Sequence, residues 1–237
     1  MRHLRRAVLA VVAVALCAAP VAVAHHPKGG GAVVAPAHKV AGFTGDELLG
    51  EAWVQLLSHP ARTFSGSCFP VGPKGKVVVP DPGPDFTSSC TVKRGTRVFV
   101  FFGADCSNVE PAPFFGADEA EQAACAVAAD EIFEAATITV DDGEPVDIHN
   151  PRFELLSPQR TVELPEDNVL GVPAGPASFV AHGWGALVKR LRPGEHTITV
   201  EVTDVELGTT TSTAFINVVR DGHDHGHDRD DEHHPDD

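Results

Sequence analysis

The chain has 237 residues, a formal net charge of −15 and an apolar fraction of 43%. This acidic balance argues against nucleic acids and anionic membranes as partners, and the length is sufficient for one large domain or two small ones with a proper core. The 19 prolines, the 22 glycines and the absence of tyrosine suit a loop-rich β protein better than a helical bundle.

The N-terminus carries the pattern of a secretory signal peptide. Three arginines within the first six residues precede an uncharged apolar run, and a small-x-small cleavage motif ends at Ala24. We predict that residues 1–24 are removed, which takes away three positive charges and leaves a net charge of −18. Cys17 does not fit a lipobox, because Leu16 stands where a small residue is needed. The mature chain lacks the roughly 20 consecutive apolar residues of a transmembrane helix, so we expect a secreted, extracellular protein.

Four cysteines follow the predicted cleavage site, and an even number of cysteines in an exported chain indicates disulfides. They are Cys68, Cys90, Cys106 and Cys125. Of the three possible pairings we favour Cys68–Cys90 with Cys106–Cys125, because sequential pairing closes short loops. Each bridge would contribute about 2–4 kcal/mol. The alternative is a four-thiolate metal site, but the chain has no C-x-x-C pair.

The first ordered element is expected to be a helix. Residues 25–42 mix glycine, proline, alanine and histidine without a period, which predicts a flexible leader. Over residues 44–58, Thr44 and Glu47 form a capping box, apolar residues recur on one face, and Pro60 ends the helix.

The middle of the chain predicts strands followed by a second helix. Residues 75–80 form a short strand, and the turn at 94–96 leads into 98–102, five successive apolar residues that predict a strand covered on both faces. An alanine-rich helix is expected over 118–135, where acidic residues in the first turn suit the helix dipole.

From residue 136 onward the pattern is that of β structure. We expect strand–turn–strand over 136–148, strands over 152–156 and 160–165, an extended segment over 178–191, and strands over 193–204 and 213–220. Two glycines flank Trp184 and predict a bulge or a close approach of two backbones. The inward-facing residues of the last two strands are predicted to be Ile198, Val200, Val202, Ala214, Ile216 and Val218.

Short strands separated by turns every 8–12 residues or so predict a mainly β fold, an antiparallel β-sandwich of immunoglobulin-like or jelly-roll-like type. The two accessory helices, near 44–58 and 118–135, would cover an edge or an open end of the sandwich. We expect one such domain over residues 43–220, flanked by disordered termini.

Two stretches of sequence resemble known proteins. Residues 193–200, Pro-Gly-Glu-His-Thr-Ile-Thr-Val, with Gly208 and a last strand over 215–219, resemble the closing hairpin of bacterial immunoglobulin-like modules, a match over about 135–220. A wider part of the chain, about residues 43–203, resembles a family of exported bacterial proteins of unknown function. This resemblance depends on five segments in this order: GDELLGEAWVQLLSHP, GSC, CTVKRGTRVFVFFGADCSNVE, LPEDNVLG and LRPGEHTI. These resemblances imply fold and localisation and carry little about function.

The C-terminal segment 221–237 is rich in histidine and acidic residues and is expected to be a disordered tail. Its histidines are His223, His225, His227, His233 and His234. Imidazoles on a flexible chain can bind Zn²⁺, Ni²⁺ or Cu²⁺, but with modest affinity and selectivity, because no rigid ligand geometry is present. The alternative is a purely solvating acidic tail. Cleavage would also leave His25 as the N-terminal residue, a copper-brace arrangement that the flexible leader disfavours.

Three other residues are candidates for catalysis. Asp105 and Glu110 follow a buried strand, where catalytic carboxylates often lie, and His182 lies beside Trp184 near the predicted bulge. The alternatives are a loop held by the Cys106 disulfide with solvated acids, and a histidine that satisfies a backbone group. The chain has no G-x-S-x-G, H-E-x-x-H, phosphate-loop or dinucleotide motif, so an enzyme is disfavoured.

We therefore expect a secreted, disulfide-stabilised binding or structural protein that recognises an unidentified extracellular ligand or cell-surface component. Its first alternative is an extracellular protein that binds divalent metals through the C-terminal tail. Its second alternative is an exported hydrolase that uses Asp105 and Glu110.

Overall fold

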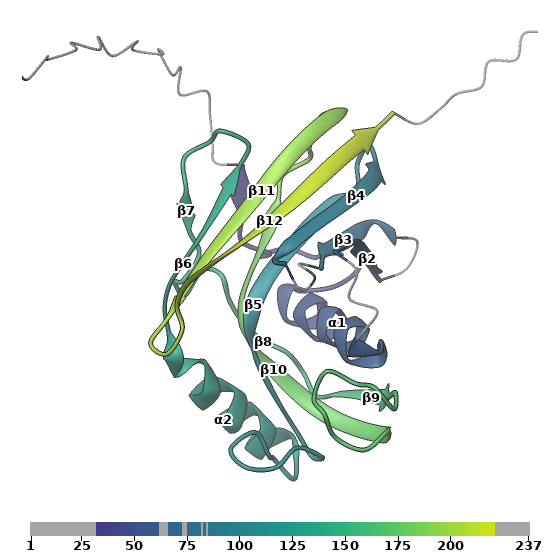
Figure 1. Ribbon diagram of the computed structural model, residues 1–237, viewed down its shortest axis with the longest axis vertical. Coiled ribbons are helices and arrows are strands. Elements are labelled where there is room, and N and C mark those ends of the chain that lie inside the picture. Colours follow the sequence, from purple (N-terminus) through teal and green to yellow (C-terminus); the bar gives the residue numbers. More distant parts are fainter. Residues whose placement is uncertain (1–31, 62–65, 73–74, 82, 84, 221–237) are drawn as a thin grey trace, which may run out of the picture. The chain divides into compact units, whose positions relative to one another are not determined.

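The strands of the computed structural model form two β-sheets, and apolar side chains alternate along many of them (Figure 1). The structure describes residues 32–61, 66–72, 75–81, 83 and 85–220. The seven-stranded sheet contains β1 (Val33–Val34), β2 (Cys68–Val71), β3 (Val77–Pro80), β5 (Arg97–Ser107), β8 (Glu154–Leu156), β9 (Arg160–Leu164) and β10 (Gly175–Val188). The five-stranded sheet contains β4 (Thr87–Lys93), β6 (Phe133–Val140), β7 (Val146–Asp147), β11 (Gly194–Asp204) and β12 (Gly208–Val219). The predicted mainly β sandwich with two helices is confirmed.

Most strand pairs are antiparallel, but each sheet contains one parallel pair. β3 runs parallel to β5, and β4 runs parallel to β12. These pairs arise because β4 and β5, which are consecutive in the chain, belong to different sheets. β4 therefore pairs with the last strand of the fold rather than with its neighbour in sequence. This is a difference from the purely antiparallel arrangement that the turn spacing predicts.

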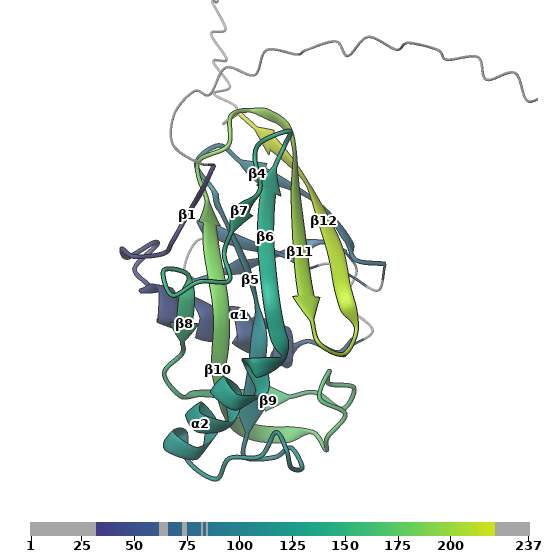
Figure 2. The same ribbon diagram turned by 90° about the vertical axis from the view of Figure 1, so that its left-hand side faces the viewer.

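The two sheets pack face to face over one apolar core, and the five-stranded sheet lies in front of the seven-stranded sheet in Figure 2. This first core includes Val98, Val100, Trp184 and Val188 from one sheet and Ile138, Ile198, Ile216 and Val218 from the other. The predicted inward-facing rows of β11 and β12 lie toward this core, with Val202 only partly buried. A second core lies on the other face of the seven-stranded sheet, where α1 (Gly45–Ser58) packs.

The N-terminus of α1 is set locally, as predicted. The Thr44 hydroxyl accepts the Glu47 backbone N–H at 3.2 Å, and the Glu47 carboxylate accepts the Thr44 backbone N–H at 2.7 Å. This reciprocal capping satisfies two backbone donors that the helix itself cannot satisfy. The predicted helix is confirmed, although it covers a sheet face rather than an edge.

The second helix is shorter than the predicted 118–135. α2 covers Glu119–Ala129, a 3₁₀ turn follows at Asp130–Ile132, and β6 starts at Phe133. Tertiary contacts explain the early end, because the Asp130 carboxylate is buried against a histidine of β10 and the Phe133 ring packs edge-on against Phe102. α2 packs on β5 and β10, below the end of β6 in Figure 2.

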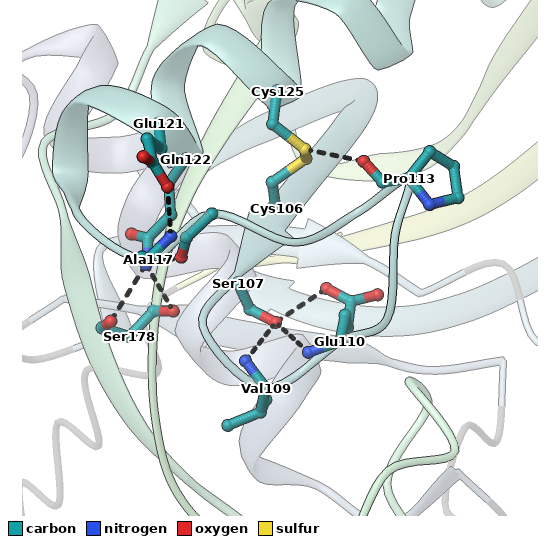
Figure 3. Close-up of a disulfide and its surroundings, with 11 residues drawn as sticks. Cys106, Ser107, Val109, Glu110, Pro113, Ala117, Glu121, Gln122, Cys125 and Ser178 are labelled. Atoms are coloured by element: carbon teal, nitrogen blue, oxygen red, sulfur yellow. Dashed lines mark hydrogen bonds between the residues drawn. A yellow bond between two sulfur atoms is a disulfide. The ribbon is translucent and has the colours of Figure 1, made fainter.

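Both predicted disulfides are confirmed. Cys68–Cys90 joins β2 of the seven-stranded sheet to β4 of the five-stranded sheet. Cys106–Cys125 joins β5 to α2 and lies beside the Pro113 carbonyl, as Figure 3 shows. The sulfur–carbonyl approach of 3.2 Å is a contact rather than a hydrogen bond, because a disulfide sulfur carries no proton.

The predicted flexible leader is wrong for its described part. Residues 32–42 include β1, which pairs with β10, and the Val33 side chain is buried in the first core. The signal-peptide prediction, residues 25–31 and the C-terminal tail 221–237 lie outside the described residues. None of the described helices has the length and apolar character needed to cross a membrane.

A close backbone approach, rather than a bulge, accounts for the glycine beside Trp184. β10 stays in continuous register with β5, and Gly183 lies opposite Gly103. Both glycines have positive φ angles, 153° and 147°, and a Cβ on either one would overlap the backbone of the other strand. Only glycine fits at these two paired positions, where the backbones of the neighbouring strands come so close.

We predict that Gly183→Ala lowers the free energy of unfolding by about 2–4 kcal/mol, because the added methyl group would force the two central strands apart. Urea denaturation would measure the change. Gly175→Ala is the matched control, since Gly175 lies on the same strand at positive φ with open space around it. Equal destabilisation by the two variants would contradict the prediction.

Candidate ligand-binding cavity

A cavity forms where the edge of β5 is left open. β3 pairs with β5 at only two positions, where Val77 lies opposite Arg97 and Val78 lies opposite Val98. From Phe99 to Cys106, none of the described strands pairs with that edge. Side chains from both faces of β5 therefore reach one common space, which extends from between the two sheets to the side of α1.

The cavity has a volume of about 760 Å³, a size typical of small-molecule sites. Its wall comes from α1, from β2, β3 and β5 of the seven-stranded sheet, and from β4, β6, β11 and β12 of the five-stranded sheet. Six aromatic side chains contribute to it, namely Trp53, Phe69, Phe86, Phe101, Phe102 and Phe133.

The apolar part of the wall follows from strand periodicity. Alternate residues of β11 face inward, so Ile198, Val200 and Val202 line the cavity in a row. Val100 and Phe102 of β5 belong to the facing sheet. The Phe102 ring is stacked on Trp184 at 5.2 Å between centroids, which holds its orientation.

The polar part of the wall continues the same rows. The inward row of β11 ends at Asp204, and Thr210 and Ser212 of β12 lie opposite Val202 and Val200. Asp81, which follows β3, lines the cavity from the other sheet. The cavity is therefore apolar along most of its wall, with carboxyl and hydroxyl groups added at these positions.

The two cavity carboxylates also hold their own turns. One oxygen of Asp81 accepts the Gly83 backbone N–H at 3.2 Å. One oxygen of Asp204 accepts the backbone N–H groups of Glu206 and Leu207 at 2.8 and 2.6 Å. Both residues are only 8% exposed. Burial raises the pKa of Asp81, against the opposing effect of the Gly83 hydrogen bond.

Asp105 and Glu110, two of the predicted catalytic residues, do lie close together, but away from this cavity. The Ser107 hydroxyl donates to the Glu110 carboxylate at 2.9 Å, as Figure 3 shows. One oxygen of Asp105 is buried without a hydrogen-bond partner. Burial, and then the negative charge of Glu110, raise the pKa of Asp105 to about 8, so its carboxyl group keeps a proton near neutral pH.

His182 lies on the opposite face of the same sheet. Its strand neighbour Ala181 lies opposite Asp105, while His182 itself lies opposite Ala104, and successive residues of a strand point to opposite faces. The predicted catalytic residues Asp105, Glu110 and His182 therefore share no cleft, and the hydrolase hypothesis gains no geometric support.

Both ring nitrogens of His182 are occupied by carboxylates. Nδ1 lies 2.7 Å from Asp130 and Nε2 lies 3.2 Å from Glu154, so the protonated ring can donate one hydrogen bond to each carboxylate. Although burial opposes the charged form, the Asp130 and Glu154 carboxylates raise the pKa of His182 above its usual value. This cluster binds the 3₁₀ turn to β10 and leaves no free nitrogen for proton transfer.

The predicted metal ligands all belong to the C-terminal tail. The described part of the chain contains no group of three or more histidine, cysteine or acidic residues placed to hold an ion. The histidines of 221–237 lie outside it, so Zn²⁺, Ni²⁺ or Cu²⁺ binding by the tail stays a prediction.

The cavity residues were missed by the sequence analysis, although one signal was present. The alternating row of β11 continues from Val202 to Asp204, and the row of β12 toward Thr210 and Ser212 is polar where a closed core would be apolar. Polar residues at inward positions of two paired strands indicate a wall that faces a cavity rather than a packed core.

We predict that Asp105→Asn removes a pH-dependent loss of stability. Because the pKa of Asp105 is raised on folding, its contribution favours the folded state below pH 4 or so and is lost as pH rises to about 8. The free energy of unfolding of the variant minus that of the wild type should therefore increase by on the order of 3 kcal/mol from pH 5 to pH 8. Chemical denaturation at both pH values measures this, and a difference independent of pH would refute it.

We predict that Asp130→Ala lowers the pKa of His182, because the buried ring loses one of its two carboxylate partners. The same change should lower the free energy of unfolding by about 3–5 kcal/mol at pH 6. The loss should shrink as pH rises through the folded pKa of His182, where the wild-type ring loses its charge. Histidine NMR titration and denaturation would measure the two effects. Glu154→Gln is the control, with an expected loss under 1 kcal/mol or so, since that side chain is 46% exposed.

Comparisons with known proteins add no assignment. No protein-family model and no curated protein matches the chain. One solved structure with similarity is the solution structure of amebosin, at 10% identity and a TM-score of 0.22, covering 60% of this chain and 96% of that chain. A similarity of this size carries no conclusion about fold or function, so any functional conclusion depends on the geometry of the cavity.

Proposed function

We propose that the protein is an exported, disulfide-stabilised binding protein that holds a small apolar molecule between its two sheets. The observation that carries this proposal is the cavity of about 760 Å³ with six aromatic side chains in its wall. Burying apolar ligand surface against such a wall is favourable by roughly 25 cal/mol per Å². Ligand sites of this kind combine a mainly apolar wall with a few polar groups.

Export is supported by two independent features. The N-terminal sequence has the order of a secretory signal peptide. Two disulfides join elements of the described fold, and stable disulfides are typical of oxidising compartments. The ligand would accordingly be met outside the cytoplasm.

Binding is favoured over catalysis by the chemistry of the cavity wall. Its titratable side chains among the described residues are Asp81 and Asp204, and each already accepts hydrogen bonds from its own turn. Among the described lining residues there is no histidine, cysteine or lysine that could act as nucleophile or general base beside them. A wall of this composition can hold and orient a ligand.

We predict saturable binding of the neutral fluorescent probe N-phenyl-1-naphthylamine, with a blue shift of its emission. Val202→Trp should weaken this binding at least tenfold or so, because the larger ring fills space inside the cavity. Glu201→Trp, on the exposed face of the same strand, is the matched control and should leave binding unchanged. Fluorescence titration measures both. Absent saturation, or equal effects of the two variants, would disprove the proposed function.

A further inference from the structure

The cavity wall is electrostatically one-sided. Its charged side chains among the described lining residues are two carboxylates, Asp81 from the seven-stranded sheet and Asp204 from the five-stranded sheet. No lysine, arginine or histidine is among those lining residues. A ligand inside the cavity is thus in contact with apolar groups, hydroxyl groups and negative charge.

The second oxygen of each carboxylate is available to a ligand. Asp81 uses Oδ1 for the Gly83 backbone N–H, and Asp204 uses Oδ1 for the two N–H groups of its hairpin turn. The Oδ2 atom of each accepts no hydrogen bond among the described residues, and neither atom is fully buried. Both residues are only 8% exposed, so a cation held in the cavity would meet these carboxylates with little water between them.

Other groups of the wall favour the same partner. Aromatic faces attract cations through their quadrupole, and six aromatic rings contribute to this wall. The hydroxyl groups of Ser88, Thr210 and Ser212 can accept hydrogen bonds from a protonated amine, whereas a quaternary ammonium head has no N–H to donate. An anionic head, in contrast, would be repelled by both carboxylates and would find no cationic side chain among the described lining residues. His59, which is not one of those lining residues, already interacts with Asp81.

We propose that the cavity selects amphipathic cations, molecules that join an apolar body to an amine or quaternary ammonium head, over neutral or anionic molecules with the same apolar body. This inference rests on the proposed function, because it requires that the cavity binds a small apolar molecule. Asp81 and Asp204 are the specificity-determining residues, and the apolar rows of β5 and β11 supply affinity that does not depend on charge.

Three ligands with one twelve-carbon chain test the inference. Dodecyltrimethylammonium, dodecanol and dodecanoate, each below its aggregation concentration, compete with N-phenyl-1-naphthylamine for the full mature protein. We expect the cation to bind at least tenfold or so more tightly than the alcohol, and dodecanoate to bind more weakly than the alcohol. Affinity for the cation should also rise with pH as Asp81 loses its proton, because burial raises its pKa against the opposing effects of the Gly83 hydrogen bond and of His59.

Charge variants separate the cavity from the acidic surface as a whole. Asp81→Asn and Asp204→Asn should each reduce the preference for the cation over dodecanol several-fold. Glu206→Gln is the matched control, because this exposed acid lies in the same hairpin turn as Asp204 and is not part of the cavity wall. Melting temperatures, measured for all variants, establish that each is folded.

The outcomes distinguish the two proposals. If none of the three ligands displaces the probe, and the probe itself does not saturate, the proposed function fails. If dodecanol and dodecanoate bind as tightly as the cation, the cavity binds apolar chains but the inference of cation selectivity is overturned. It is also overturned if Glu206→Gln reduces the preference as much as the two cavity variants do, since the effect then belongs to the overall negative charge.

Discussion

The antiparallel pairing of β5 with β10 is the constraint on which the rest of the described structure depends. These two long strands form the middle of the seven-stranded sheet, and each of their faces carries a separate core. One face packs against the five-stranded sheet and α2, and the other packs against α1. The register is compatible with only one residue type where Gly103 and Gly183 meet, because their backbones approach too closely for any side chain.

The cavity is a consequence of unequal strand lengths. β10 pairs with β5 over ten positions, whereas β3 pairs with it at two, so β5 is covered along one edge and open along most of the other. Its open edge is lined by aromatic side chains from both faces of the strand. A longer β3 would continue the sheet, and the space that we assign to a ligand would hold protein side chains instead.

Local patterns predict this fold well, and long-range contacts limit the prediction. Thr44 and Glu47 set the start of α1 through neighbours three residues apart, so the sequence alone suffices there. The end of α2 depends on Asp130 meeting His182, 52 residues later, and alanine-rich sequence gives no sign of that contact. The cavity is still harder to predict, because its walls come from seven strands of the two sheets and from α1, and Asp204 resembles an ordinary turn residue.

The Cys68–Cys90 disulfide has a consequence for this arrangement. It joins β2 to β4 and thereby ties one sheet to the other by a covalent bond, while Phe69 and Ser88, close to these cysteines in sequence, line the cavity. The spacing of the opposing walls is thus limited by chemistry as well as by packing. In a reducing environment the same chain would hold its binding space together by side-chain contacts alone.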